Sequence, residues 1–174
     1  NDGSNVLVGG VGNDRLLGGR GNDTLTGGAD KDIFEWNLAD RSATPGAPAI
    51  DNLTDFTYGG STTSSTVPSG DLLSQRTDSL DLRDLLVGES STSLVTGGTP
   101  VIGNLQNYLD ISFVGGNTEI RISSTGGFSG GTYAAGQEDQ RIVLSGVNLF
   151  TATGTSTEAD LLQRLLANGT LVVD

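Results

Sequence analysis

Three aspartates, Asp14, Asp23 and Asp32, lie nine residues apart near the start of the chain, and each follows a glycine-rich stretch. A carboxylate is a hard oxygen ligand, and glycine lets backbone carbonyl groups come close to an ion because it accepts positive φ values. Calcium takes about six to eight such oxygens, whereas magnesium demands a tighter octahedron and keeps more water. The pattern therefore predicts sites for Ca2+. The alternative, that these aspartates cap turns without binding metal, accounts less well for the regular spacing.

The aspartates belong to a tandem repeat that runs from Gly9 to Phe34 and reads GGVGNDRLL, GGRGNDTLT and GGADKDIF. In each unit, six residues are expected to form a turn. The next three form a short strand whose central apolar residue, Leu16, Leu25 or Phe34, points inward. Two units complete one coil, so strands 18 residues apart stack in parallel and their turns lie side by side. The sequence thus predicts a parallel β-roll.

These units resemble the nonapeptide repeats of RTX proteins, which bacterial type I secretion systems export. In that family, one turn contributes its second and fourth residues and its aspartate to a calcium ion. The turn 18 residues further on contributes its first and third residues and its aspartate. The resemblance implies one site on Gly10, Gly12, Asp14, Gly27, Ala29 and Asp32. It implies a second site on Asn1, Gly3, Asn5, Gly18, Arg20 and Asp23.

The repeats depart from the family pattern at three places. Asn5 replaces an aspartate, so the second site should be weaker. Asp30 stands where glycine is usual, in a turn that asks for a left-handed backbone. The period fails after Phe34, and no fifth turn is expected at residues 36–41. Asp23 would then share a half-formed site with Asp40 or another downstream carboxylate.

Composition limits the other function classes. The formal net charge of -12 disfavours nucleic acid and anionic membranes as partners and suits a divalent cation. The chain has no Cys and no His, which excludes disulfides, zinc sites of the usual ligand type and His-dependent triads. No apolar run approaches the length of a membrane span, so no membrane insertion is expected.

Beyond the repeats, the pattern indicates mostly strands. Residues 50–56 have apolar positions too widely spaced to assign as a strand, and residues 104–109 suggest a short helix. Strands are expected at 33–36, 80–82, 109–113, 120–122 and 141–144, with a hairpin turn at 115–117. Phe34 and Trp36 are expected to plug the end of the stack. The predicted fold class is all-β: a parallel β-roll that continues into a β-sandwich-like C-terminal part with a short C-terminal α-helix.

The last segment carries the clearest helix signal. Thr155 with Glu158 fits a capping box, and Asn168-Gly169 fits a helix stop. Four leucines fall on one face of this helix: Leu161, Leu162, Leu165 and Leu166.

The order of segments after the repeats resembles the C-terminal target region of very large type I secreted adhesins. The segments are IFEWNLAD, DNLTDF, SLDLRDLLVGE, LQNYLDISF, QRIVLSGVNL and LLANGTLVVD. The resemblance implies a calcium-binding β-roll at residues 1–36 and a β-rich domain at 37–174. It also implies that the second domain carries an uncleaved secretion signal, which the ABC transporter of a type I system reads. We expect a monomer that is secreted or lies on the bacterial cell surface. A longer polypeptide is expected upstream.

Other readings remain open at this stage. The module could instead be the C-terminal calcium domain of a secreted RTX protease or lipase. Four acids, Asp71, Asp78, Asp81 and Asp84, could bind a further ion, although strand-edge and capping roles are favoured. Asp78, Asp81 and Asp84 are also the only cluster that a two-carboxylate glycosidase could use, and no pocket motif supports it. We therefore expect no enzyme. Direct adhesion to ice or sugars is not favoured, because the sequence shows no ordered Thr array and no aromatic platform.

Overall fold

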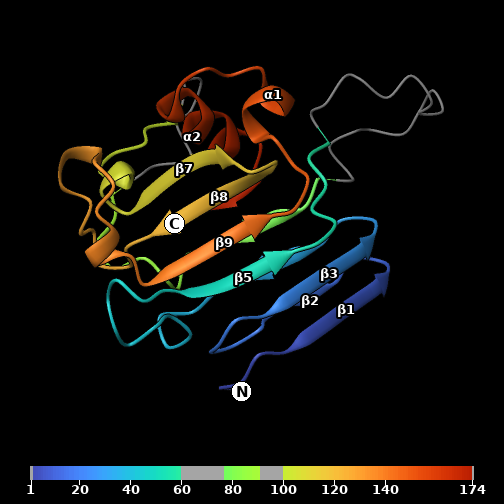
Figure 1. The fold of residues 1–174 in the computed structure, drawn as a ribbon. Helices are drawn as coiled ribbons and strands as arrows, with labels where there is room; N and C mark the ends of the chain where they lie inside the picture. Colours follow the sequence, from blue (N-terminus) through green and yellow to red (C-terminus); the bar gives the residue numbers. More distant parts are fainter. Residues whose placement is uncertain (1, 60–76, 91–99, 174) are drawn as a thin grey trace.

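A computed structural model describes residues 2–59, 77–90 and 100–173 (Figure 1). Its strands form two sheets. The six-stranded sheet runs in the order β1 (Val6–Val11), β3 (Thr24–Ala29), β5 (Ala49–Leu53), β9 (Gln140–Leu144), β8 (Asn117–Ile122) and β7 (Leu109–Val114). The four-stranded sheet runs in the order β10 (Leu171–Val172), β6 (Ser79–Asp81), β4 (Ile33–Glu35) and β2 (Arg15–Leu16). The fold is therefore mostly strands, with parallel sheets and few helices, as the sequence predicts.

The first four strands form the predicted roll. β1 pairs in parallel with β3, and β2 pairs in parallel with β4. The register sets Leu7 opposite Leu25 and Leu16 opposite Phe34, which are the inward positions of units 18 residues apart. Leu25 and Phe34 are fully buried because they face each other's sheet across the interior of the coil. The expected stacking of alternate units is confirmed.

The roll continues for a further coil that the sequence analysis did not assign. β5 pairs in parallel with β3 and β6 pairs in parallel with β4, so Leu53 lies opposite Leu25 and Leu80 lies opposite Phe34. The paired positions of successive coils are now 28 and 46 residues apart in the sequence, rather than 18. The hydrogen bonds between the aspartates of these coils have the same separations. Long connections hide the period, so residues 50–56 give no clear signal. Both sheets run through the domain boundary expected at residue 36.

The remaining strands complete the six-stranded sheet. β9 pairs in parallel with β5 and antiparallel with β8, and β8 forms an antiparallel hairpin with β7. Gly115 and Gly116 have positive φ values of 60° and 90°, so the hairpin turn lies where it is expected. Short 3-10 turns occur at η2 (Leu105–Asn107), η3 (Ser129–Gly131) and η4 (Ala135–Gln137).

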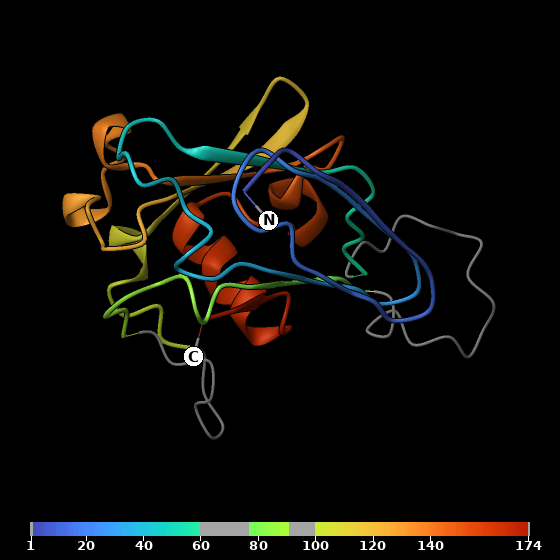
Figure 2. The same ribbon diagram turned by 90° about the horizontal axis from the view of Figure 1, so that it is seen from below.

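Two helices, α1 (Leu149–Thr153) and α2 (Glu158–Ala167), lie between the layers in the C-terminal half of the molecule (Figure 2). The four leucines of α2 are buried, as predicted. The capping residue differs from the prediction: Thr157 accepts from the backbone N–H of Asp160 at 3.2 Å. Thr155 is instead part of the turn that ends α1, and its backbone N–H donates to the carbonyl oxygen of Phe150 at 3.0 Å. The Glu158 carboxylate instead accepts a hydrogen bond from the backbone N–H of Ile111 at 2.6 Å.

The closing segment is a strand of the four-stranded sheet. β10 pairs in parallel with β6, and Leu171 and Val173 are buried. Phe34 and Trp36 are also buried and belong to the same core, and the ring of Phe34 lies 6.2 Å from that of Phe56. In the described ranges, no helix has the length and apolar character that crossing a membrane requires.

Candidate calcium site

The turn that ends at Asp14 lies directly against the turn that ends at Asp32. In the strand register Gly10 faces Gly28, and the N–H of Gly12 donates to the carbonyl oxygen of Ala29 at 3.2 Å. The predicted ligand residues of the first site, Gly10, Gly12, Asp14, Gly27, Ala29 and Asp32, therefore belong to two neighbouring turns. Their roles as ligands remain a prediction.

Each turn begins with a glycine because the aspartate of the same turn occupies the space of a side chain. A Cβ at Gly9 would lie 2.7 Å from Asp14 Oδ2. A Cβ at Gly18 or Gly27 would collide in the same way with Asp23 or Asp32. The glycine thus leaves room for the carboxylate to fold back over its own turn.

Asp30 adopts a left-handed conformation, as its place in the repeat predicts. Its φ of 81° is the single positive value at a non-glycine position among residues 2–59, 77–90 and 100–173. Aspartate enters this region more readily than most residues, so the turn keeps the repeat geometry despite the substitution.

The aspartates form ladders from coil to coil. The backbone N–H of Asp14 donates to Asp32 Oδ1 at 2.9 Å, and the N–H of Asn5 donates to Asp23 Oδ1 at 2.8 Å. One oxygen of each later aspartate therefore fixes the backbone of the preceding coil. The other oxygen is left for another partner.

That second oxygen has no partner in the described parts of the chain. The Oδ2 atoms of Asp14, Asp23 and Asp32 are buried and accept no hydrogen bond. Burial of an unpaired carboxylate oxygen is unfavourable, and a bound cation removes the penalty. These residues therefore fit a calcium ion, to which Asp14 and Asp32 would supply carboxylates and the glycine-rich turns would supply carbonyl oxygens.

The pKa of Asp32 reflects the same arrangement. Burial raises this pKa above its usual value, and the nearby Asp14 carboxylate acts in the same direction. The hydrogen bond from the Asp14 N–H opposes the rise. A cation between the turns would reverse the first two effects by compensating the negative charge.

The second predicted site is less complete. Asn1 lies outside the described residues. The side-chain amide of Asn5 donates to the carbonyl oxygen of Gly3, and it lies 3.3 Å from Asp23 Oδ1. An amide N–H thus stands where the first site has a carboxylate oxygen. The remaining predicted ligands, Gly18, Arg20 and Asp23, lie in one turn, and the exposed Arg20 side chain donates to Ala39 at 2.6 Å.

The sequence pattern assigned no role to Asn13 and Asn22, the residues before Asp14 and Asp23. Asn13 Oδ1 accepts from the N–H of Lys31 at 3.1 Å, and Asn22 Oδ1 accepts from the N–H of Ile50 at 2.9 Å. Each bond joins equivalent positions of successive coils. The recurrence of Asn-Asp in two tandem units is the signal that could have revealed this second ladder.

The downstream acids have other partners. Asp40 accepts from the N–H of Asn37 at 3.0 Å, so Asp23 meets Asp51 and not Asp40 in the ladder. Asp81 pairs with Arg83 at 2.7 Å, and Asp84 is exposed. Asp71 lies outside the described residues. Across the described ranges, no group of three or more acidic, Cys or His side chains could hold a metal, so a calcium site here would need backbone carbonyl oxygens as well.

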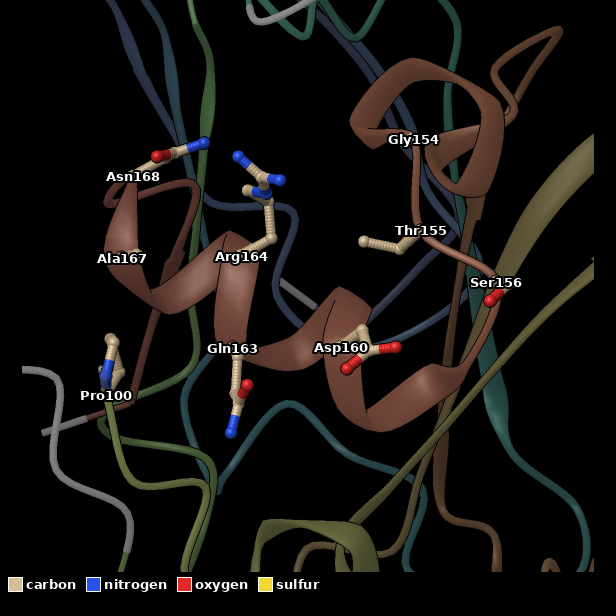
Figure 3. Close-up of a pocket in the computed structure, with 9 residues that line it drawn as sticks. All are labelled: Pro100, Gly154, Thr155, Ser156, Asp160, Gln163, Arg164, Ala167 and Asn168. Atoms are coloured by element: carbon tan, nitrogen blue, oxygen red, sulfur yellow. The ribbon is translucent and has the colours of Figure 1, made fainter.

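A polar groove of about 530 Å³ runs along the outer side of α2 (Figure 3). Its lining residues include Thr155, Asp160, Gln163, Arg164 and Asn168. Asp160 is the one acid among the residues that line it, whereas glycoside hydrolysis needs two carboxylates across the substrate.

The match to a family model agrees with the geometry of the turns. Residues 1–34 match the family model of the RTX calcium-binding nonapeptide repeat, in four copies. No curated protein matches the chain. The solution structure of the AlgE6R3 subunit from the Azotobacter vinelandii mannuronan C5-epimerase is similar, with 21% identity and a TM-score of 0.46. That match covers 91% of this chain and 77% of the epimerase subunit. RTX nonapeptide repeats bind Ca2+, so residues 1–34 form a calcium-binding β-roll module.

Proposed function

We propose that this chain is the calcium-binding C-terminal module of a type I secreted RTX adhesin, which folds on calcium outside the cell. The main support is a set of three buried aspartate oxygens, on Asp14, Asp23 and Asp32, that accept no hydrogen bond from any described residue. Without a cation, burial of these carboxylates costs free energy. Ion binding offsets that cost, so it contributes directly to the free energy of folding. The roll stays unfolded where calcium is scarce and forms where it is plentiful.

The place of the export signal follows from the resemblance of the C-terminal segments to adhesin target regions. α2 and β10 carry the address for the ABC transporter in this proposal. The folded molecule buries the leucines of α2 and pairs β10 with β6. The transporter therefore reads the segment before the domain folds. A module of this kind supplies export and folding, not catalysis, and acts as a monomer in the secreted or cell-surface protein.

Secretion of a fused reporter tests the address. The reporter is joined to residues 1–174, and a matched fusion lacks residues 158–174. Export of the first fusion and retention of the second is the expected result. Equal export of both would place the signal elsewhere. A third fusion with Asp14→Asn and Asp32→Asn separates the two functions, because it should be exported but should fold poorly outside.

A further inference from the structure

Two aspartates outside the repeats continue the ladders. The N–H of Asp23 donates to Asp51 Oδ1 at 2.8 Å, and the N–H of Asp32 donates to Asp78 Oδ1 at 2.9 Å. The strand register agrees, since the residue after each pairs across the sheet: Thr24 with Asn52 and Ile33 with Ser79. Asp51 and Asp78 are therefore the third-coil counterparts of Asp23 and Asp32.

The second oxygen of each third-coil aspartate is satisfied by the protein. Asp51 Oδ2 accepts from the indole N–H of Trp36 at 2.7 Å and from the Gln140 side chain at 2.9 Å. Asp78 Oδ2 accepts from the N–H of Thr57 at 2.7 Å. These bonds stabilise a buried carboxylate without a cation. Within the described ranges, the Oδ2 atoms of Asp14, Asp23 and Asp32 in the first two coils have no such donors.

A third carboxylate holds the turn of the second coil. Asp55 lies where the repeats have their first glycine, since Leu53 faces Leu25 two positions earlier. Its oxygens accept from the N–H groups of Gly27 and Gly28 at 2.9 and 2.8 Å. The third coil thus contacts the second-coil turn through side chains, at the residues that open the first calcium site.

We propose that Asp51 and Asp78 are positioning residues of a calcium-independent coil that orients the calcium ligands of the coil before it. Neither residue touches the ion. Each holds the backbone of a ligand aspartate, Asp23 or Asp32, through a bond that needs no metal. The third coil folds in the absence of calcium with the C-terminal part of the chain, and the repeats assemble on it when calcium binds. The calcium ladder ends at Asp23 and Asp32 because N–H donors take over the role of the cation at the next coil.

The affinity of the whole chain for calcium tests the positioning role, and this test rests on calcium binding by the repeats. Asp78→Ala removes the ladder acceptor, and Asp84→Ala removes the same charge from an exposed position. Isothermal titration should show about a tenfold or greater loss of affinity for Asp78→Ala, as for other residues that orient metal ligands. Asp84→Ala should stay within about twofold of the unchanged protein, since a distant exposed charge is screened. Equal affinities of the two variants would overturn the proposal, whereas an unchanged protein that binds no calcium would instead contradict the proposed function.

The fluorescence of Trp36 provides a second test that needs no substitution. It is the one tryptophan in the sequence, is buried and bonds to Asp51. In chelator, its emission should stay that of a buried indole while the circular dichroism of the roll changes. A shift of the emission to that of a solvated indole on chelation would show that the contact between Trp36 and Asp51 depends on calcium, and would overturn the proposal even if Asp78→Ala fails to fold.

Discussion

The Asp32 carboxylate accepts a hydrogen bond from the backbone N–H of Asp14 at 2.9 Å and keeps its second oxygen buried beside Gly27. One side chain thus joins two coils, while its second oxygen accepts no hydrogen bond from the described residues. The hydrogen bond joins the stacked coils, and in the proposed function the second oxygen makes that stacking dependent on a cation. This division of roles connects the nine-residue period to calcium-dependent folding.

Asp32→Asn should weaken calcium binding by at least about tenfold, which corresponds to about 1.4 kcal/mol. The amide keeps an acceptor for the Asp14 N–H but removes the charge that compensates the ion. Isothermal titration measures the loss, and Asp84→Asn, which removes an exposed charge, is the control. An unchanged affinity in Asp32→Asn would mean that Asp32 is not a ligand.

Asn5→Asp should strengthen the second site. The substitution replaces an amide N–H, which now points at Gly3 and lies close to the Asp23 carboxylate, by a second carboxylate oxygen. Isothermal titration should then show that the dissociation constant of the weak calcium site falls by about tenfold or more. A bound cation relieves the repulsion between two neighbouring carboxylates, so the pair gains more binding free energy than one carboxylate does. Asn13→Asp places the same charge at a position that serves backbone stacking, and it should give a smaller gain. If both variants gained equally, general electrostatics would explain the effect.

Leu25→Ala should destabilise the calcium-bound protein by about 2–5 kcal/mol, because Leu25 is fully buried between the sheets and the neighbouring coils leave little room for collapse. Val8→Ala, on the exposed face of β1 at 68% exposure, should change stability by about 0.5 kcal/mol or less. Urea unfolding at saturating calcium compares the two. Similar losses for both variants would contradict the inward assignment of the central strand position.

Glu158 should make stability depend on pH. Burial raises its pKa from 4.5 to about 7, the Asp110 charge adds to the rise, and the bond from the Ile111 N–H opposes it. Between these two pH values the folded protein binds more protons than the unfolded chain, so this contribution to stability is present at low pH and is lost as pH rises through about 7.

Glu158→Gln keeps an acceptor for Ile111 and removes the titration. The variant should exceed the unchanged protein in stability by about 1 kcal/mol at pH 8.5, a value reduced for solvent screening of a half-exposed group. The difference should shrink at pH 5.5. Urea unfolding at both pH values, with calcium saturating, measures it. A difference that is the same at both pH values would rule out titration of Glu158 as its cause.

The sequence was informative where spacing is constant and weak where connections are long. Asp14, Asp23 and Asp32 can be predicted because one turn and one strand fill nine residues every time. Asp51 and Asp78 occupy the same structural position, yet they lie 28 and 46 residues after their counterparts, so the nine-residue spacing does not reach them. Hydrogen bonds between coils, rather than sequence distance, define the ladder there.

The helix cap shows a second limit of pattern reading. Thr155 and Glu158 have the spacing of a capping box, and so do Thr157 and Asp160. Tertiary contacts decide between them, because the end of α1 uses Thr155 and β7 uses Glu158. Neither of these two contacts can be predicted from the local spacing of residues.

Amide hydrogen exchange of β1 and β3 reports directly whether the roll folds with calcium, since these strands carry no aspartate of the third coil. We expect strong protection of the Leu7 and Leu25 amides in calcium and loss of that protection in chelator. Protection should return on adding calcium but not on adding an equal concentration of magnesium. Equal protection of both amides in chelator and in calcium would contradict calcium-coupled folding of the roll.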